Sequence, residues 1–573
     1  MPPPMPPPMA NAAIWFAPDG YDPATKGING RRVAGESFLR GYFAHAEAED
    51  FVSLSYFPAD EAAFRAFARN AGVTRPLRNV RLDTPHLIAP LDVVYYSAPN
   101  FAAECWRRAP HGATAYALSG ITHTTATKAV MQGIFDLRSA PQMPWDAIIC
   151  TSRAVQTSLR QLMELAEAHL ATRFPGSILP ARPLLPVIPL GIHCDDHAPD
   201  SAAGQALRAR LGIATNDIAL ACIARLTPEE KFDPLPLFVA LDQAQLATGT
   251  RLHLILCGQF SDDIARKVFD DGAAALMPDV GYHILDGADA ALRKATLSAA
   301  DIFVFPIDNV QETFGLAPVE AMAAGLPLIV SDWDGMQDTV TPDTGIRIPV
   351  QMADASLTTY LGLRHYGGTD TYRQYLSQLS AVTRLDVGAL IAAIVTLATD
   401  AGLRARMGAA GKARARRLYD WRVVIPQMQA LWGEQAAMLA HARTLPPKPG
   451  QARVDAARLP VAPSPAHLFA AYPSPRPDPV PDPAPDQAPE PRYHSLHREG
   501  RPGPEEAFTL RNYAATRRLF EDPARISAVA AALNAAGPAG ATAEDLALAS
   551  AQPLRAVQRI LLWLLKYHFA KEA

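Results

Sequence analysis

The chain has 573 residues, a formal net charge of -4 at pH 7 and 19% charged residues. This length exceeds what one hydrophobic core can organise, so several domains are expected. The small net charge gives no electrostatic reason to expect a nucleic acid or an anionic membrane as the main partner. The five cysteines are scattered without metal-ligand spacing, which predicts structural thiols in a reducing compartment.

The first residues, MPPPMPPPMANAAIWF, have neither a basic region nor a continuous apolar stretch. They therefore do not resemble a signal peptide, and residues 1–10 are predicted to be disordered. No run approaches the roughly 18 apolar residues of a membrane-spanning helix. We expect a cytoplasmic protein, with a peripheral position at the inner membrane face as the closest approach to a membrane.

Short apolar runs recur up to about residue 350, with amphipathic helical patterns between them. Most runs are apolar throughout, as expected for parallel strands that are covered on both faces. The predicted strands are residues 13–18, 51–57, 93–98, 147–152, 218–225, 252–258, 301–307 and 326–332. This alternation predicts an α/β fold with two Rossmann-like, doubly wound domains, residues 11–192 and 193–440, that face a cleft.

The composition changes in residues 441–504, which contain PSPRPDPVPDPAPDQAPEP. This segment cannot bury enough apolar surface to fold, so a disordered, polyproline-like linker is predicted. A spacer is favoured over a docking site for a proline-recognising partner. Order returns in residues 505–573, a small all-α domain for which a winged-helix or helix-turn-helix shape is one option. Its predicted helices are residues 526–537, 542–550 and 553–570.

The most informative segment is DIFVFPIDNVQETFGLAPVEAMAAGLPLIVSDWDG, residues 301–335. A buried strand leads into a polar loop, and a helix is predicted to begin near Leu316. Free backbone amides at such a helix N-terminus bind anions, and Gly315 lets a phosphate or sugar approach closely. The amides concerned are those of Thr313, Phe314, Gly315 and Leu316. Glu312 and Glu320 flank the turn, and carboxylates accept hydrogen bonds from sugar hydroxyls. On spacing alone, two solvated acids near a helix start are an equally good interpretation.

The stretch ETFGLAPVEAMAAGLPLIVSD resembles the E-x7-E signature of the family 4 glycosyltransferases, which are retaining enzymes of the GT-B fold. The resemblance implies that Glu312 contacts the donor sugar and that Glu320 contacts the ribose of its nucleotide. The family's Gly-Gly step after the next strand is replaced by DWDGMQDTV (332–340), which retains Gly335. We expect this departure to change local contacts only. The resemblance covers roughly residues 10–435, and its specific motifs lie mainly between 220 and 335.

The segment IARLTPEEKFDP (223–234) follows the first strand of the second domain. It resembles the family segment in which an arginine and a lysine clamp the donor diphosphate, here Arg225 and Lys231. Two fixed cations can stabilise the charge of a departing nucleoside diphosphate without a metal. An arginine and a lysine in a loop are by themselves ordinary surface residues, and their place in the matching α/β unit favours the clamp.

The first domain carries weaker signals. KGINGRRVAGESFLRGYF (26–43) resembles the family's glycine loop but lacks tandem glycines, so only Gly30 and Arg31 are assigned to donor binding. YALSGITHTTATKAVM places His123 between a strand and a helix, where the family often has a histidine against the donor sugar. A lone histidine is more often structural, but ligands of open α/β sheets bind at such strand ends.

These features predict retaining transfer of a sugar from a nucleoside diphosphate donor to a glycan, lipid-linked or other hydroxyl acceptor, as in polysaccharide biosynthesis. Glu312 and His123 would position the donor, and Arg225 and Lys231 would stabilise charge, with no cofactor and no metal. An epimerase or a phosphorylase of the same fold fits less well, because the first lacks this spacing and the second needs a cofactor lysine.

The alternative from another class is a catalytically inactive, sugar-nucleotide-binding regulator. It would use the C-terminal helical domain to bind DNA or a protein. From Glu505 to Ala573 the chain has eight Lys/Arg against seven Asp/Glu. A DNA-binding module should be clearly basic, so a protein partner is favoured and a nucleic acid is not expected.

Overall fold

The computed structural model describes residues 10–21, 30–448, 450–472, 490–496, 500–511 and 519–572, with the backbone alone for Gly30 and Arg31. The predicted disordered N-terminus lies outside this part except for Ala10. The chain divides into two compact units, Met1–Leu468 and Phe469–Ala573. Each unit is described by itself.

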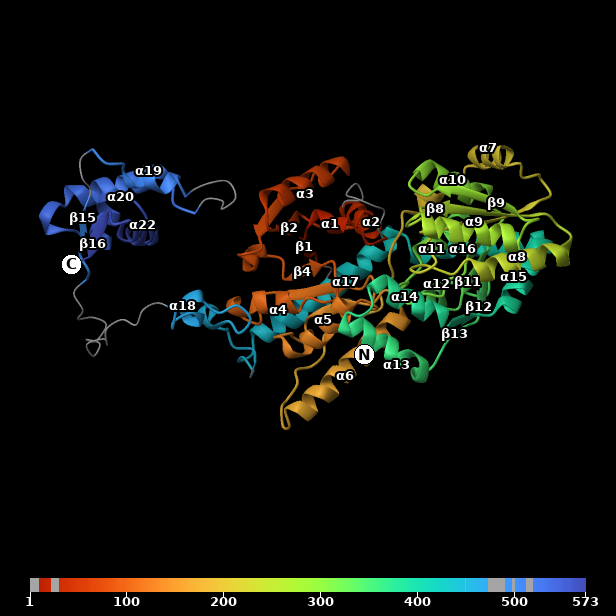
Figure 1. The fold of residues 1–573 in the computed structure, drawn as a ribbon, viewed down its shortest axis with the longest axis horizontal. Helices are drawn as coiled ribbons and strands as arrows, with labels where there is room; N and C mark the ends of the chain where they lie inside the picture. The colour runs from red at the N-terminus through yellow and green to blue at the C-terminus, as the bar shows by residue number, and fades with distance from the viewer. Residues whose placement is uncertain are drawn as a thin grey trace, which may run out of the picture. The chain divides into compact units, whose positions relative to one another are not determined.

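The first lobe of the larger unit contains a parallel six-stranded sheet with the order β3-β2-β1-β4-β5-β6 (Figure 1). The strands are β1 (Ala13–Trp15), β2 (Phe51–Ser55), β3 (Leu77–Arg81), β4 (Val93–Tyr96), β5 (Ala117–Ile121) and β6 (Ala147–Ile149). The helices are α1 (Pro18–Tyr21), α2 (Gly30–His45), α3 (Pro58–Asn70), α4 (Ala102–Arg108), α5 (Lys128–Ser139) and α6 (Arg153–Arg173). This strand order is that of a Rossmann fold.

The second lobe repeats the arrangement with the order β12-β11-β10-β7-β8-β9. Its strands are β7 (Ile218–Ile223), β8 (Leu252–Gly258), β9 (Gly281–Asp286), β10 (Ile302–Phe305), β11 (Leu328–Ser331) and β12 (Gly345–Ile348). Its helices are α7 (Ser201–Leu211), α8 (Leu235–Thr248), α9 (Asp263–Leu276), α10 (Ala290–Ala299), α11 (Leu316–Ala324), α12 (Met336–Thr339), α15 (Val387–Thr399) and α16 (Ala401–Leu418). The prediction of two Rossmann-like, doubly wound domains is confirmed.

A helical hairpin is inserted after β12. It consists of α13 (Ala355–Gly367) and α14 (Tyr372–Ala381). Its ends are joined by a short antiparallel pair, β13 (Val350–Met352) and β14 (Thr383–Leu385).

The chain passes between the lobes twice, once near Ile192 and once near Asp420. These two connecting segments lie side by side, because Ile192 pairs with Asp420 in a parallel bridge. The buried Trp421 indole fills this junction and donates a hydrogen bond from Nε1 to Ser37 Oγ at 2.8 Å. Gly41 and Gly191 make room for it, because a Cβ at either position would lie 2.5 or 2.4 Å from the indole.

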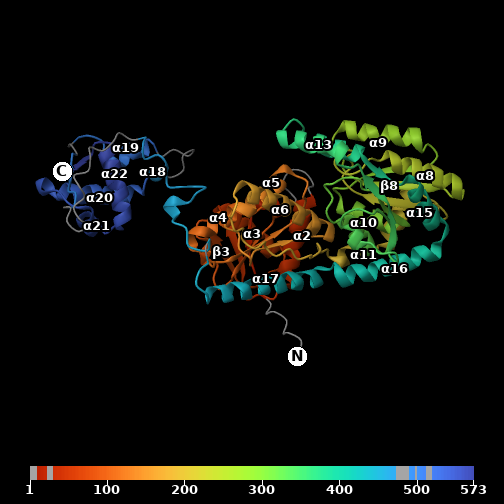
Figure 2. The same cartoon turned by 90° about the horizontal axis from the view of Figure 1, so that it is seen from below.

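The long helix α17 (Trp421–Arg443) runs along the first lobe (Figure 2). Trp432 Nε1 donates to Ser119 Oγ at 3.3 Å, and Gln435 Nε2 donates to the carbonyl oxygen of Leu118 at 2.9 Å. The sequence places residues up to 440 in the second domain, whereas these buried contacts attach α17 to the first. The second lobe therefore ends structurally before α17.

Part of the predicted linker has defined structure. It contains η4 (Ala456–Arg458) and α18 (Pro465–Leu468). Val454 N donates to the carbonyl oxygen of Ala109 at 3.1 Å, which fixes this segment to the first lobe. The prediction of a linker disordered throughout 441–504 is therefore wrong for this segment, while its most proline-rich part, residues 473–489, lies outside the described residues.

Within the described ranges, no helix alone has the length and apolar composition required to cross a bilayer. The bent pair α15–α16 satisfies both requirements jointly, by length and composition only. The cysteines Cys105, Cys150, Cys194, Cys222 and Cys257 are buried free thiols, as predicted.

The smaller unit contains the three helices that the sequence predicts, which are α20, α21 and α22, together with a helix, α19, and a sheet that it does not predict. The helices are α19 (Pro504–Thr509), α20 (Pro523–Ala535), α21 (Ala543–Ser550) and α22 (Leu554–Lys566). The antiparallel strands β15 (Tyr493–Ser495) and β16 (Ala570–Glu572) form the sheet. The expectation of an all-α domain missed it because each strand has only three residues, too few to give a sequence pattern.

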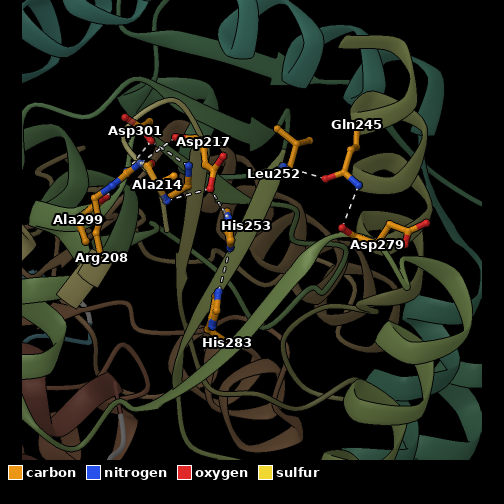
Figure 3. A network of polar contacts seen from close by, with 11 residues as sticks. Arg208, Ala214, Asp217, Gln245, Leu252, His253, Asp279, His283, Ala299 and Asp301 are labelled. Carbon is orange, nitrogen blue, oxygen red and sulfur yellow. Dashed lines mark hydrogen bonds and ion pairs between the residues drawn. The ribbon is translucent and has the colours of Figure 1, made fainter. Parts of the chain in front are cut away.

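A polar network joins β7, β8 and β9 at their amino-terminal ends (Figure 3). The buried His253 ring contacts Asp217 Oδ2 through Nε2 and His283 Nε2 through Nδ1, both at 3.1 Å. A Cβ on Gly281 would lie 2.0 Å from His253 Nδ1, so a glycine is needed there. Burial, with the adjacent His253, lowers the pKa of His283.

This network predicts acid sensitivity. The unfolded His283 binds a proton near pH 6.5, whereas the folded residue does so only at lower pH. Stability should therefore fall as the pH drops below about 6.5, because the unfolded state binds more protons there. His283→Gln keeps a polar partner for His253 and should make the decline in Tm between about pH 7 and 5 shallower. Equal slopes for both proteins would contradict the assignment.

Candidate functional site

The candidate site lies in the loops that follow β7 and β10, at the carboxyl edge of the second sheet. The loop after β10 runs to Gly315, which caps α11 in the left-handed conformation at φ +82°. A residue with a side chain is strained there, so glycine is required. The predicted helix start at Leu316 is confirmed. Backbone amides therefore point from the start of α11 toward the loop, as an anion site requires.

Glu312 and Lys231 form an ion pair in this loop region. Their side chains are 13% and 19% exposed, so the pair is shielded from solvent but reachable. Glu312 Oε1 also accepts a hydrogen bond from the amide of Gly315 at 2.9 Å. Burial disfavours the carboxylate, but the Lys231 ammonium and the backbone amides outweigh it and lower the pKa of Glu312. The residue is thus a fixed anion.

Arg225, like Lys231, contacts the loop between β10 and α11, which contains Glu312 and is called the acidic loop. Its Nη2 donates to Gln311 Oε1 at 2.6 Å, and its Nη1 donates to Glu230 Oε2 at 2.7 Å. Both predicted clamp residues therefore contact consecutive residues, Gln311 and Glu312. The sequence did not single out Gln311, whose type carries no chemical signal in a polar loop.

The acidic loop also touches the first lobe. Thr313 Oγ1 donates to the carbonyl oxygen of His123 at 3.1 Å. His123 also lines a small pocket of the first lobe, together with residues such as Pro189 and Trp421. Phe314 is buried behind the loop. The structure thus brings His123, Thr313, Glu312 and Lys231 into one region.

Three predicted site residues, Glu320, Gly30 and Arg31, have no described contact with this cluster. Glu320 lies half-buried in the second turn of α11, and its carboxylate has no hydrogen bond or ion pair to any residue that the structure describes. Gly30 begins α2 and Arg31 follows it, and the Arg31 side chain lies outside the described part. Their donor-binding roles stay predictions.

Asp334 is a residue that the sequence interpretation passed over. It occupies the turn between β11 and α12 with φ +40°, a left-handed conformation that glycine favours. Its Oδ1 accepts a hydrogen bond at 2.6 Å from Ser152 Oγ of the first lobe. Arg153 and Asp338 form a second contact between the lobes, at 2.8 Å. The expectation that the departure at 332–340 changes only local contacts is therefore wrong.

The surroundings of Asp334 make it titrate near neutrality. Burial, opposed by the Ser152 hydroxyl and reinforced by the charges of Glu312 and Asp338, raises its pKa to about 7. As the pH rises through about 7, Asp334 gains a negative charge close to Glu312. If the site binds a nucleoside diphosphate, as the sequence resemblance implies, the affinity for this anion should then fall by roughly three- to tenfold.

The measurement is the Kd of GDP or UDP between about pH 5.5 and 8.5, in wild type and Asp334→Asn. Asparagine keeps the shape and the acceptor for Ser152, and the ligand's own titration is common to both proteins. The pH dependence should be flatter in the variant. Parallel curves would mean that Asp334 does not act on the bound anion.

Residues 205–359 match the family model described as Glycosyl transferases group 1. The second lobe is thus similar to group 1 glycosyltransferases. The matched region contains the clamp loop, the acidic loop and Asp334. It ends inside α13, so most of the helical hairpin lies beyond it.

Curated relatives agree with this match. A GDP-mannose-dependent monoacylated alpha-(1-6)-phosphatidylinositol monomannoside mannosyltransferase of Corynebacterium glutamicum is 25% identical over 253 residues, which are 43% of this chain and 55% of the relative. A phosphatidyl-myo-inositol mannosyltransferase of Mycolicibacterium smegmatis is 28% identical over 113 residues, 20% of this chain and 28% of the relative. The chain spans about half the length, or less, of these relatives.

Solved structures with similar folds include Anabaena HepE in complex with UDP and a sucrose-phosphate synthase from Thermosynechococcus elongatus. HepE is 17% identical with a TM-score of 0.48, and the alignment covers 76% of this chain and 100% of that one. The synthase is 18% identical with a TM-score of 0.46, over 75% and 100%. Likeness at this level does not indicate a function by itself.

No group of three or more histidine, cysteine, aspartate or glutamate side chains within the described ranges is arranged to hold a metal ion. The expectation that the reaction needs neither metal nor cofactor stays a prediction.

Proposed function

We propose that the chain is a retaining glycosyltransferase that uses a nucleoside diphosphate sugar and an acceptor hydroxyl, without a metal. The observation that carries this proposal is the cluster of Arg225, Lys231 and Glu312 around the start of α11. It combines two cations and the N-terminus of α11 for a diphosphate with a fixed carboxylate, held by the Gly315 amide, for a sugar. The similarity of residues 205–359 to group 1 glycosyltransferases supports it.

The ion pair between Lys231 and Glu312 suits a site that exchanges partners. When the donor binds, its diphosphate takes the Lys231 ammonium and its sugar hydroxyls take the Glu312 carboxylate. In the free protein, the two charges pair with each other. In the bound protein, each pairs with the donor. The cost of shielding each charge from water is therefore offset in both states. Arg225, whose guanidinium is held by Glu230 and Gln311, would supply a second cation to the same anion.

The transfer step breaks the bond between the anomeric carbon and the diphosphate oxygen, and the bonding electrons leave with the diphosphate. The acceptor oxygen forms its bond to the anomeric carbon on the same face. The acceptor proton passes to the departing diphosphate oxygen, so no protein base is required. The residues of this chain position the reactants and stabilise the developing negative charge.

GDP-mannose is the donor to test first, because curated relatives are named as GDP-mannose-dependent mannosyltransferases. Their names also make a lipid-linked acceptor and a peripheral membrane position parts of the proposal. The chain should be incubated with GDP-mannose, UDP-glucose and other nucleotide sugars, and the release of nucleoside diphosphate followed. Nuclear magnetic resonance of the released or transferred sugar reports the anomeric configuration.

Release of one nucleoside diphosphate with a retained anomer supports the proposal. An inverted product would refute retention alone. Binding without turnover on any acceptor would favour the inactive regulator. The protein partner expected for residues 505–573 stays a prediction. Leu548 and Leu562 of that unit are exposed apolar side chains that such a partner would cover.

A further inference from the structure

The inner side of the α13–α14 hairpin holds buried polar groups that the fold does not use. His365 is 6% exposed, and neither of its ring nitrogens has a hydrogen-bond partner among the described residues. Its ring stacks on Tyr375 with 4.2 Å between centroids and 7° between planes. Buried polar atoms are almost always satisfied in folded proteins, so an unpaired ring calls for a partner.

Asp370 lies beside His365 and is 4% exposed. Its Oδ1 accepts both hydrogen bonds from Arg364, at 3.0 and 2.5 Å. Its Oδ2 is buried and has no donor within the part of the chain that the structure describes. Two neighbouring side chains thus offer three unused polar atoms.

The hairpin contacts both lobes; its helices α13 and α14 can be followed in Figure 1. Lys128 Nζ of the first lobe donates to the carbonyl oxygen of Tyr366 at 2.8 Å. Ser380 Oγ donates at 2.8 Å to Asp308 in the loop that follows β10. The Tyr372 hydroxyl lies near Thr124 of the first lobe and near Gln311, the residue that holds Arg225, and is itself buried without a hydrogen-bond partner among the described residues.

The protonation state of His365 limits what can bind. Burial and the Lys128 ammonium lower its pKa, against the charge of Asp370. The ring is therefore neutral, with one nitrogen as donor and the other as acceptor. The free oxygen of Asp370 is an acceptor that repels anions. An uncharged ligand with neighbouring hydroxyl groups satisfies all three atoms, whereas a phosphate does not.

We propose that His365 and Asp370 bind a sugar ring of the substrate through two neighbouring hydroxyl groups, with the Tyr372 ring at its edge. The inference rests on the proposed function, which supplies sugars at this cleft. The sugar belongs either to the donor or to the acceptor, and the same hydroxyl chemistry serves both.

The test compares wild type with His365→Phe, which keeps the stack on Tyr375 and removes both nitrogens. Calorimetric titrations of the full chain use GDP-mannose, GDP, UDP-glucose, UDP, and methyl α-mannopyranoside in the presence of GDP. If the donor sugar occupies the subsite, the affinity for a nucleotide sugar falls about tenfold and that for its nucleoside diphosphate is unchanged. If the acceptor occupies it, only methyl glycoside binding is lost.

Asp370→Asn provides a second variant of nearly the same shape and should shift the same affinities. Tyr360→Phe is the matched control, because Tyr360 is 65% exposed on the outer face of α13. Unchanged affinities for every ligand in both variants would overturn the inference and leave the buried atoms to water. If wild type binds no nucleotide at all, the proposed function itself fails, and the inference with it.

Discussion

Lys231→Met is expected to slow nucleotide-sugar turnover by about a hundredfold or more, because a fixed cation that stabilises the departing diphosphate is lost. Methionine keeps an apolar stem of similar length over the Phe305 ring, where the Lys231 ammonium lies 4.9 Å from the centroid. The substitution also leaves the Glu312 carboxylate without its ion-pair partner. Stability should therefore fall by about 1–3 kcal/mol. Initial rates of nucleoside diphosphate release and thermal unfolding measure the two effects.

A double variant separates catalysis from folding. Lys231→Met with Glu312→Leu removes both charges, so much of the lost stability should return while turnover stays low. Lys267→Met is the matched control, since Lys267 pairs with Asp271 on the surface of α9 and is 74% exposed. It should change neither quantity measurably. Normal turnover in either Lys231 variant would contradict the clamp.

Most inner strands and the fully buried edge strand β6 are visible in the sequence, whereas the three more exposed edge strands are not. β7 and β8 are buried at every position, which produces the uninterrupted apolar runs IALACI and LHLILCG. The edge strands β3, β9 and β12 were not predicted. They are partly exposed and carry residues such as Arg78, His283 and Arg347. A strand with one open side needs no continuous apolar run, so its pattern resembles that of a loop.

The same limit applies to the site. Glu312, Arg225 and Lys231 could be singled out from the sequence because the segments around them resemble family motifs, and the structure brings the three residues together. Asp334 could not, since its partner Ser152 is 182 residues away in the chain. The sequence shows that the family's Gly-Gly step is replaced and that only Gly335 is retained. The resulting contact between Asp334 and Ser152 depends on how the two lobes face each other. His365 and Asp370 likewise become notable only through their burial without partners.

Gly335→Ala is expected to impair the site without touching any charged group. The backbone of Gly335, with φ -62°, suits alanine, so its conformation gives no reason for a defect. The added Cβ would, however, lie 2.4 Å from Phe314 Cα and 2.5 Å from the carbonyl oxygen of Phe314. Both are backbone atoms of the acidic loop, which must therefore move. A displacement of about 1 Å at Glu312 can cost roughly a hundredfold in turnover, and the overpacking about 1–3 kcal/mol in stability.

Gly362→Ala is the control, because a Cβ there meets no atom within 4 Å. Gly362 lies inside α13, where alanine favours the helix, so this variant should be as stable as wild type or slightly more so. Turnover and thermal unfolding should be measured for both variants under the same conditions. If Gly335→Ala retains full turnover, the acidic loop tolerates movement, and the donor is positioned by the clamp cations. If turnover falls with nucleoside diphosphate affinity unchanged, the loop orients the sugar, as its contact with Lys231 and Gly315 implies.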